Sequence, residues 1–178
     1  MPRQHSDSQE FSRFVEADSV GSHRMERRIS ANPEERAALA LRFELIAIDR
    51  LEAVFSLSRA GDDVIHVTGS ITAAVTQSCV ITLAPVPAQV AESFAVDFAD
   101  GAARRAEDPD IDFDESDPPE PIENGHIDLG ELAAEQLALA LDPYPKAPGA
   151  AIPAEFSAPD EPEAAPERAI NPFSILKK

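Results

Sequence analysis

Residues 64–83 alternate between apolar and polar side chains, and this period of two constrains the fold more than any other feature. Eight of the ten odd-numbered positions from 65 to 83 are apolar, while the even positions are mostly His, Thr and Ser. A straight strand of this length would run roughly 60 Å at ~3.3 Å per residue. That is too long for a small domain, so we expect a bend at Gly69 or a break at Gln77–Ser78.

Other short alternating runs predict further strands around this central one. Residues 51–57 and 90–98 both alternate, and FSRFV at 11–15 has the composition of a short strand. Pro85 and Pro87 follow the central run, and we expect them to form a turn before the 90–98 strand.

Two segments carry the signals of helices. Residues 33–43 follow Asn32, a preferred N-cap, and begin with Pro33, Glu34 and Glu35, which suit a first helical turn. Residues 129–141 place apolar side chains such as Leu129 and Leu132 at helical spacing.

Asp128 and Glu131 have the spacing of a capping box at the start of the second helix. Pro143 ends this helix, because the residue before a proline is pushed out of helical geometry. The PYPKAP run that follows, which contains Tyr144, is expected to be extended.

These elements predict an α+β domain over residues 11–150, in which a bent antiparallel sheet or a partial β-barrel packs against two main helices. An acidic loop is expected at 99–126, and disorder at 1–10. Residues 151–178 are expected to form a low-complexity acidic tail that ends in the NPFSILKK segment.

The acidity of the chain is concentrated in its C-terminal part. The net charge is −18, and EDPDIDFDESDPPEPIE at 107–123 contains nine carboxylates and four prolines. This run begins like a calcium loop at Asp110, Asp112 and Asp114, but it lacks the required Gly and Glu at the sixth and twelfth positions. An exposed acidic loop is therefore the better interpretation, with an electrostatic contact to a basic partner as an alternative.

Residue types for catalysis or metal binding are not clustered. Cys79 is the only cysteine, which excludes a disulfide framework and a thiolate zinc site. The four histidines lack metal-ligand spacing, and no phosphate-binding glycine motif is present. We expect no cofactor, no metal, no small-molecule substrate and no enzymatic activity. The absence of a signal peptide and of an apolar run of ~18 residues predicts a cytoplasmic protein that does not enter a membrane.

Arg24, Arg27 and Arg28 lie close together in the segment 17–28, which is expected to be a loop. They are either ordinary surface charge or a basic patch that contacts RNA phosphates.

Several ordered segments resemble the YceD-like family of large ribosomal RNA subunit accumulation proteins. DLGELAAEQLALALDPYPKAPGA at 128–150 carries the resemblance most clearly. EFSRFVEAD near the start, the run 117–137 and the terminal NPFSIL agree with it. The central run 67–86 has the pattern Q-x-C-V-x-T-L-x-P, with Gln77, Cys79 and Pro85 in place.

The resemblance implies a non-enzymatic role in large-subunit biogenesis, in which the protein supports 23S rRNA accumulation or maturation. From the acidic charge and the tightly specified helix, we expect the partner to be a ribosomal protein or a pre-50S particle, contacted through the 129–141 helix and its exit, with Glu131, Glu135 and Tyr144 as candidate contacts. Gln77, Cys79, Pro85, Asp128, Leu129, Leu132 and Pro143 would hold the fold. The alternative is a direct RNA-binding protein that uses the Arg24, Arg27 and Arg28 patch.

Overall fold

The computed structural model describes residues 10–61, 64–100 and 118–152. The chain divides into one unit of Met1–Ala147 and another of Pro148–Lys178, and every element below belongs to the first. The expected N-terminal tail up to residue 9, the middle of the acidic loop and the NPFSILKK segment lie outside the described residues.

The elements are β1 (Phe14–Glu16), η1 (Ala17–Ser19), β2 (Met25–Ser30), α1 (Pro33–Arg42), β3 (Ala47–Ala60), β4 (Val64–Ser78), β5 (Pro85–Ala99), β6 (Glu120–Pro121), β7 (His126–Asp128) and α2 (Leu129–Ala140).

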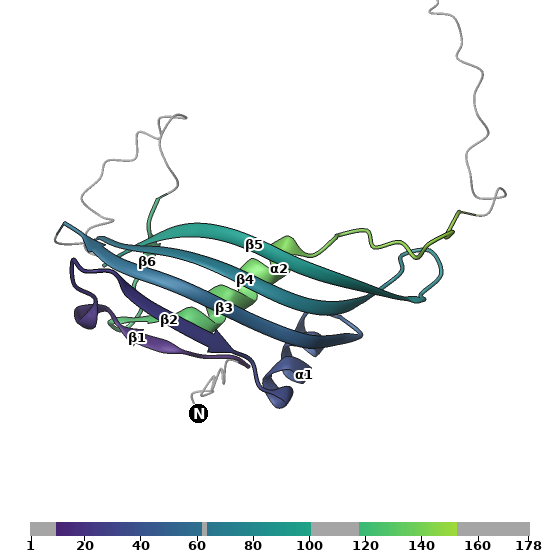
Figure 1. Cartoon of the computed structure of the whole chain (residues 1–178), viewed down its shortest axis with the longest axis horizontal. Coiled ribbons are helices and arrows are strands. Elements are labelled where there is room, and N and C mark those ends of the chain that lie inside the picture. Colours follow the sequence, from purple (N-terminus) through teal and green to yellow (C-terminus); the bar gives the residue numbers. More distant parts are fainter. Residues whose placement is uncertain (1–9, 62–63, 101–117, 153–178) are drawn as a thin grey trace, which may run out of the picture. The chain divides into compact units, whose positions relative to one another are not determined.

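A five-stranded sheet in the order β2-β3-β4-β5-β6 forms the body of this unit, and β1 and β7 form a second, two-stranded sheet. The first four strands of the large sheet pair antiparallel, and β6 pairs with the end of β5 in parallel. The sheet is bent and open (Figure 1). The predicted α+β class is confirmed, with a bent sheet in place of a closed barrel.

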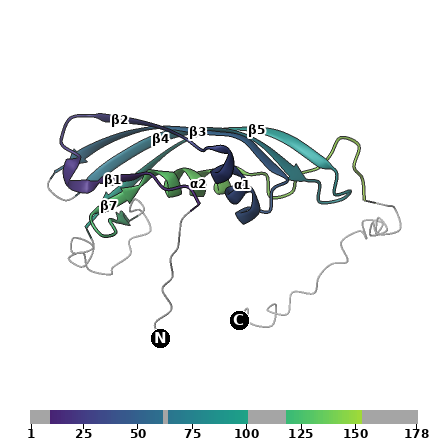
Figure 2. The same cartoon turned by 90° about the horizontal axis from the view of Figure 1, so that it is seen from below.

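The large sheet buries only one of its faces. In β4 the odd-numbered residues from Ile65 to Gln77 are buried, and the even-numbered Ser and Thr side chains between them are half-buried or exposed. Both helices and the β1–β7 pair lie on the buried side (Figure 2). The period-two pattern of this strand therefore reports an antiparallel sheet that packs its apolar face on helices and leaves its polar face open.

The central strand ends at Ser78, at the break expected from the sequence, and the turn occupies residues 79–84. The expectation that Pro85 and Pro87 form that turn is wrong, because both lie in β5 opposite Ser78 and Thr76. β5 has β4 on one side, and β6 pairs only with Phe98 and Ala99 on the other. Proline lacks a backbone N–H and is tolerated where this group would face solvent at a sheet edge.

The N-caps of the two helices differ in one respect. At α1 the Asn32 side chain accepts from the backbone N–H groups of Glu34 and Glu35, while the Glu35 carboxylate accepts from the Asn32 N–H, a complete capping box. At α2 the Asp128 side chain accepts from Gly130 and Glu131. The reciprocal bond expected from Glu131 is replaced by an ion pair with Arg42.

The first turn of α2 packs directly against the backbone of the N-terminal segment at Gly130. A Cβ built on Gly130 would lie 2.2 Å from the carbonyl oxygen of Phe11. Phe11 itself is buried in the core. Only a residue without a side chain allows this approach, so Gly130 fixes how closely α2 and the N-terminal segment pack.

We predict that Gly130→Ala lowers the free energy of unfolding by about 2 kcal/mol, because the added methyl group forces backbone apart and overpacking of this kind costs ~1–3 kcal/mol. Helix propensity alone would favour the alanine. Gly21→Ala is the matched control, since a Cβ there meets nothing within 4 Å. Urea denaturation followed by circular dichroism measures both, and equal stability of the two variants would contradict the close packing.

Candidate partner-binding groove

A groove with a cavity volume of about 690 Å³ lies where the ends of β5, β6 and β7 meet α2. We call it the acidic groove. Residues from all four elements and from β1 line it: Phe14, Val96, Phe98, Glu120, Pro121, Glu123, Asn124, His126, Ile127, Asp128, Glu131, Leu132, Glu135 and Gln136. Its volume is within the range of ~300–1,000 Å³ that is usual for ligand sites.

The groove has an apolar floor. Val96 and Phe98 come from the inner side of β5 and are only half-buried, although they lie opposite the fully buried Val67 and Ile65. Leu132 of α2 continues this floor, and Phe14 leaves 65% of its surface exposed at the margin. Apolar surface therefore remains partly open to solvent at this end of β5.

Carboxylates surround this floor. Five lining residues are acidic, namely Glu120, Glu123, Asp128, Glu131 and Glu135, and no Lys or Arg is among the lining residues in the described part of the chain. The pKa of Glu135 is raised, first by partial burial and then by the negative charges of Glu131 and Glu120. The groove thus holds more negative charge than its surroundings neutralise, and a cation entering it would be stabilised.

Glu131 alone among these five has a cationic partner within the described residues. The Arg42 guanidinium donates to both of its oxygens, at 2.6 and 3.0 Å. Arg42 also reaches Glu10 at 3.4 Å, and the carboxylates, Glu131 first, raise its pKa. Glu131 therefore links α2 to α1, and Glu120, Glu123 and Glu135 are the carboxylates left for a ligand.

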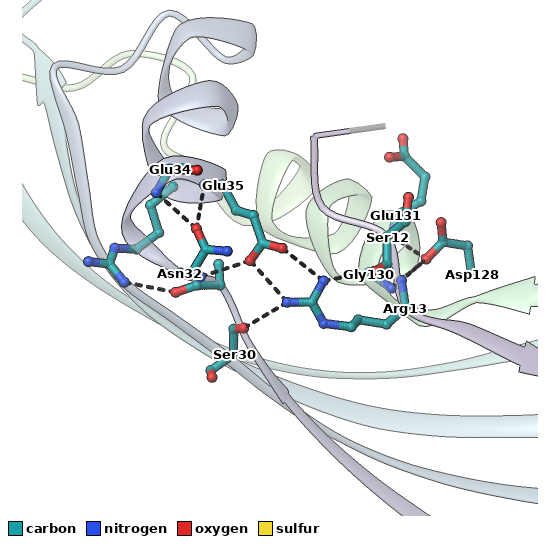
Figure 3. Close-up of polar contacts among 11 residues, drawn as sticks. Ser12, Arg13, Ser30, Asn32, Glu34, Glu35, Asp128, Gly130 and Glu131 are labelled. Atoms are coloured by element: carbon teal, nitrogen blue, oxygen red, sulfur yellow. Dashed lines mark hydrogen bonds and ion pairs between the residues drawn. The ribbon is translucent and has the colours of Figure 1, made fainter. Parts of the chain in front are cut away.

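Arg13, which directly precedes β1, positions the wall of the groove that α2 forms (Figure 3). Its guanidinium donates to both oxygens of Glu35 on α1, at 2.9 and 3.0 Å. Its backbone N–H donates to Asp128 Oδ1 at 2.7 Å, and its carbonyl accepts from the Leu129 N–H at 3.0 Å. One residue thus fastens both helices to the N-terminal segment.

Asp128 belongs both to this hydrogen-bond network and to the lining of the groove. Its Oδ1 accepts three backbone N–H groups, those of Arg13, Gly130 and Glu131. Its Oδ2 is buried and has no hydrogen-bond partner within the described residues. A buried carboxylate oxygen without a partner leaves part of the charge unsatisfied next to the groove.

The structure brings together some of the residues predicted as partner contacts and separates others. Glu131 and Glu135 both line the groove, as do Asp128 and Leu132. Tyr144 is exposed beyond the opposite end of α2 and does not line it. Leu129 is buried, where it packs in the core.

Arg27 and Arg28 do not lie on one face of their strand. The expectation of a loop over 17–28 is wrong for its last residues, because Arg27 and Arg28 lie in β2 and pair with Phe55 and Val54. Neighbouring residues of a strand point to opposite faces, so these two side chains diverge. Charged residues on an edge strand, including one on the core side such as Arg27, also hinder edge-to-edge association of sheets.

Of the residues predicted to be structural, Gln77, Cys79, Pro85 and Pro143 lie near the far end of β4, whereas Asp128, Leu129 and Leu132 lie at the start of α2. The Gln77 side chain donates to the Asp142 carbonyl at 2.8 Å, directly before Pro143, and the Val80 N–H donates to the Pro145 carbonyl. Cys79 is fully buried, and its Sγ accepts from the N–H groups of Thr82 and Ala147. These donors, Ala147 first, lower the pKa of the thiol to about 6. The end of the central strand and the segment that follows α2 are therefore held together by hydrogen bonds.

Sequence reasoning missed half of the groove. Val96 and Phe98 belong to a recognised strand, but nothing in the pattern showed that their side chains stay partly open. Glu120 and Glu123 belong to the run interpreted as an exposed acidic loop, with an electrostatic contact to a basic partner as the alternative, and Phe14 belongs to a strand of only three residues. The one available signal was the apolar alternation of β5 next to a dense acidic run.

The described residues contain no group of three or more His, Cys, Asp and Glu side chains placed to hold a metal ion. No helix within them is long and apolar enough to cross a membrane.

The fold and the groove define an acidic α+β protein with a one-sided sheet. The profile of the family described as large ribosomal RNA subunit accumulation protein YceD matches residues 67–178, and the chain belongs to this family. Comparison with curated proteins and with solved structures gave no significant match. The family description connects the chain to the accumulation of large-subunit ribosomal RNA.

We predict that the Arg13–Glu35 pair contributes stability above the ordinary pKa of Glu35 and that this contribution is lost at low pH. The hydrogen bonds from Arg13, and after them that from the Asn32 N–H, lower the pKa of Glu35 against the opposing effect of burial. A carboxyl group whose pKa is lower in the folded state stabilises the fold above its unfolded pKa, near 4.5, and ceases to do so as pH falls through the folded value.

Glu35→Gln should therefore cost about 1 kcal/mol at pH 7, since the pair is partly screened by solvent, and less below pH 4. Denaturation curves at a series of pH values measure this. Glu34→Gln, on the same exposed turn, is the control. A stability difference for Glu35→Gln that does not change with pH would contradict the role of the ion pair.

Proposed function

We propose that this chain is a non-enzymatic, cytoplasmic factor that supports 23S rRNA accumulation by binding a ribosomal protein, alone or within a pre-50S particle. Its membership of the YceD family supports a role in large-subunit biogenesis. The observation that carries the finer proposal is the acidic groove, with five carboxylates and no Lys or Arg among its described lining residues.

The charge of the groove favours a protein partner over RNA. Proteins that bind ribosomal RNA neutralise its phosphates with Lys and Arg, so they carry basic segments that an acidic groove complements. The net charge of −18 accelerates the encounter with such proteins and opposes that with RNA. A factor of this charge would cover a basic ribosomal protein until RNA replaces it.

Direct RNA binding through Arg24, Arg27 and Arg28 is the alternative function. The divergence of Arg27 and Arg28 from β2 gives it no concentrated basic surface within the described residues. Direct RNA binding predicts that bound ribosomal proteins are lost upon RNase treatment, whereas binding of a ribosomal protein predicts that they are retained.

We predict that the full-length tagged protein, purified from bacterial cytosol, retains large-subunit ribosomal proteins after RNase treatment. Substitution of Arg24, Arg27 and Arg28 by Ala should leave the retained set unchanged, as identified by mass spectrometry. Loss of these proteins upon RNase treatment, or upon the Arg→Ala substitutions, would instead support RNA binding. The absence of ribosomal components from every sample would contradict both functions.

A further inference from the structure

The floor of the acidic groove accommodates an apolar side chain. Val96 and Phe98 reach it from the end of β5, and Leu132 borders them from α2. Val96 and Phe98 are partly exposed and leave an apolar surface that a bound side chain could cover. Covering such surface contributes roughly 25 cal/mol per Å², which gives a ligand with an apolar residue an advantage over one with charge alone.

The two walls of the groove offer carboxylates to a cation. Glu120 comes from β6 on one side, and Glu135 from α2 on the other. Neither forms an ion pair with any other described residue, whereas Glu131 is held by Arg42. The mutual repulsion of these carboxylates would be relieved by one ammonium or guanidinium group between them.

The shape and charge of the groove disfavour other occupants. Phosphate groups of RNA would be repelled by the same carboxylates. A divalent cation lacks a cluster of three suitable ligands in the described residues. Residues 107–118, which precede β6 in the chain, are themselves acidic and do not complement the walls.

We infer that the acidic groove binds a segment of a partner protein that presents an apolar side chain beside a Lys or Arg. The apolar side chain lies on Val96, Phe98 and Leu132, and the cation lies between Glu120 and Glu135. This inference rests on the proposed function for the identity of the partner, a basic protein of the large subunit. The site itself is defined only by the chemistry of the groove.

A direct test measures the binding of fluorescein-labelled octapeptides to the full chain by fluorescence anisotropy. Each octapeptide contains one Leu and one Lys. Neighbouring side chains of an extended segment point to opposite sides, so one peptide places the pair at adjacent positions and another at alternate positions, which establishes the preferred spacing. We expect at least one of these peptides to bind and to weaken as salt is raised. Replacement of its Leu by Ser, or of its Lys by Glu, should weaken binding at least ten-fold.

The protein variants separate the groove from general electrostatics. Glu120→Gln combined with Glu135→Gln should weaken binding at least ten-fold. The matched control, Glu34→Gln with Glu52→Gln, removes the same charge from exposed positions outside the groove and should change binding less than two-fold. Val96→Thr keeps the shape of the floor side chain but not its apolarity, and should also weaken binding. Circular dichroism verifies that each variant is folded.

Four outcomes overturn the inference: no binding of any Leu–Lys peptide, equal losses in the groove and control variants, tighter binding of an RNA octanucleotide at the same residues, or a dimer in sedimentation whose formation excludes the peptide.

The cytosolic purification distinguishes the two proposals. If the groove and control variants retain ribosomal proteins equally, the inferred binding site is wrong and the proposed function is unaffected. If the peptide binds but no ribosomal component is retained, the proposed function is wrong and the inferred binding site is unaffected.

Discussion

The contact between the first turn of α2 and the N-terminal segment determines where the other elements of this fold lie. Gly130 allows the helix to meet the Phe11 carbonyl, Asp128 caps the helix and accepts the Arg13 N–H, and Arg13 reaches Glu35 on α1. A sheet with one apolar face needs such a cover, because that face would otherwise remain in water. The same contact holds α2 beside the end of β5, which creates the acidic groove.

The carboxylates that hold the elements of the fold together differ from those that we propose for binding. Glu35 and Glu131 are paired with Arg13 and Arg42 and connect the two helices to each other and to the N-terminal segment. Glu120, Glu123 and Glu135 have no such partner among the described residues, and the pKa of Glu135 is raised first by its partial burial and then by the charges of Glu131 and Glu120. The paired groups thus connect the elements of the fold, and the unpaired groups are those through which we propose that a basic ligand is bound.

The sequence predicts those parts of the fold whose signals are local. The alternation from Ile65 to Gln77 and the Asn32-Pro33-Glu34-Glu35 start of α1 correspond to the observed strand and cap. Local patterns failed at the sheet edges: β2 is short and charged, and β5 begins with two prolines that an edge position tolerates. The groove joins residues of β1, β5, β6, β7 and α2, and Glu131 pairs with Arg42, 89 positions away. Such contacts depend on packing between distant elements, which periodicity and capping signals do not specify.

Site-specific photo-crosslinking in growing cells tests most directly whether the acidic groove contacts a basic protein of the large subunit. A photoreactive amino acid in place of Glu123, which is exposed at the rim of the groove, should crosslink to a Lys- and Arg-rich segment of a large-subunit ribosomal protein. The same amino acid in place of Arg28, on the open face of β2, should give little of this product. Crosslinks to RNA at position 28, with none to protein at position 123, would contradict the account.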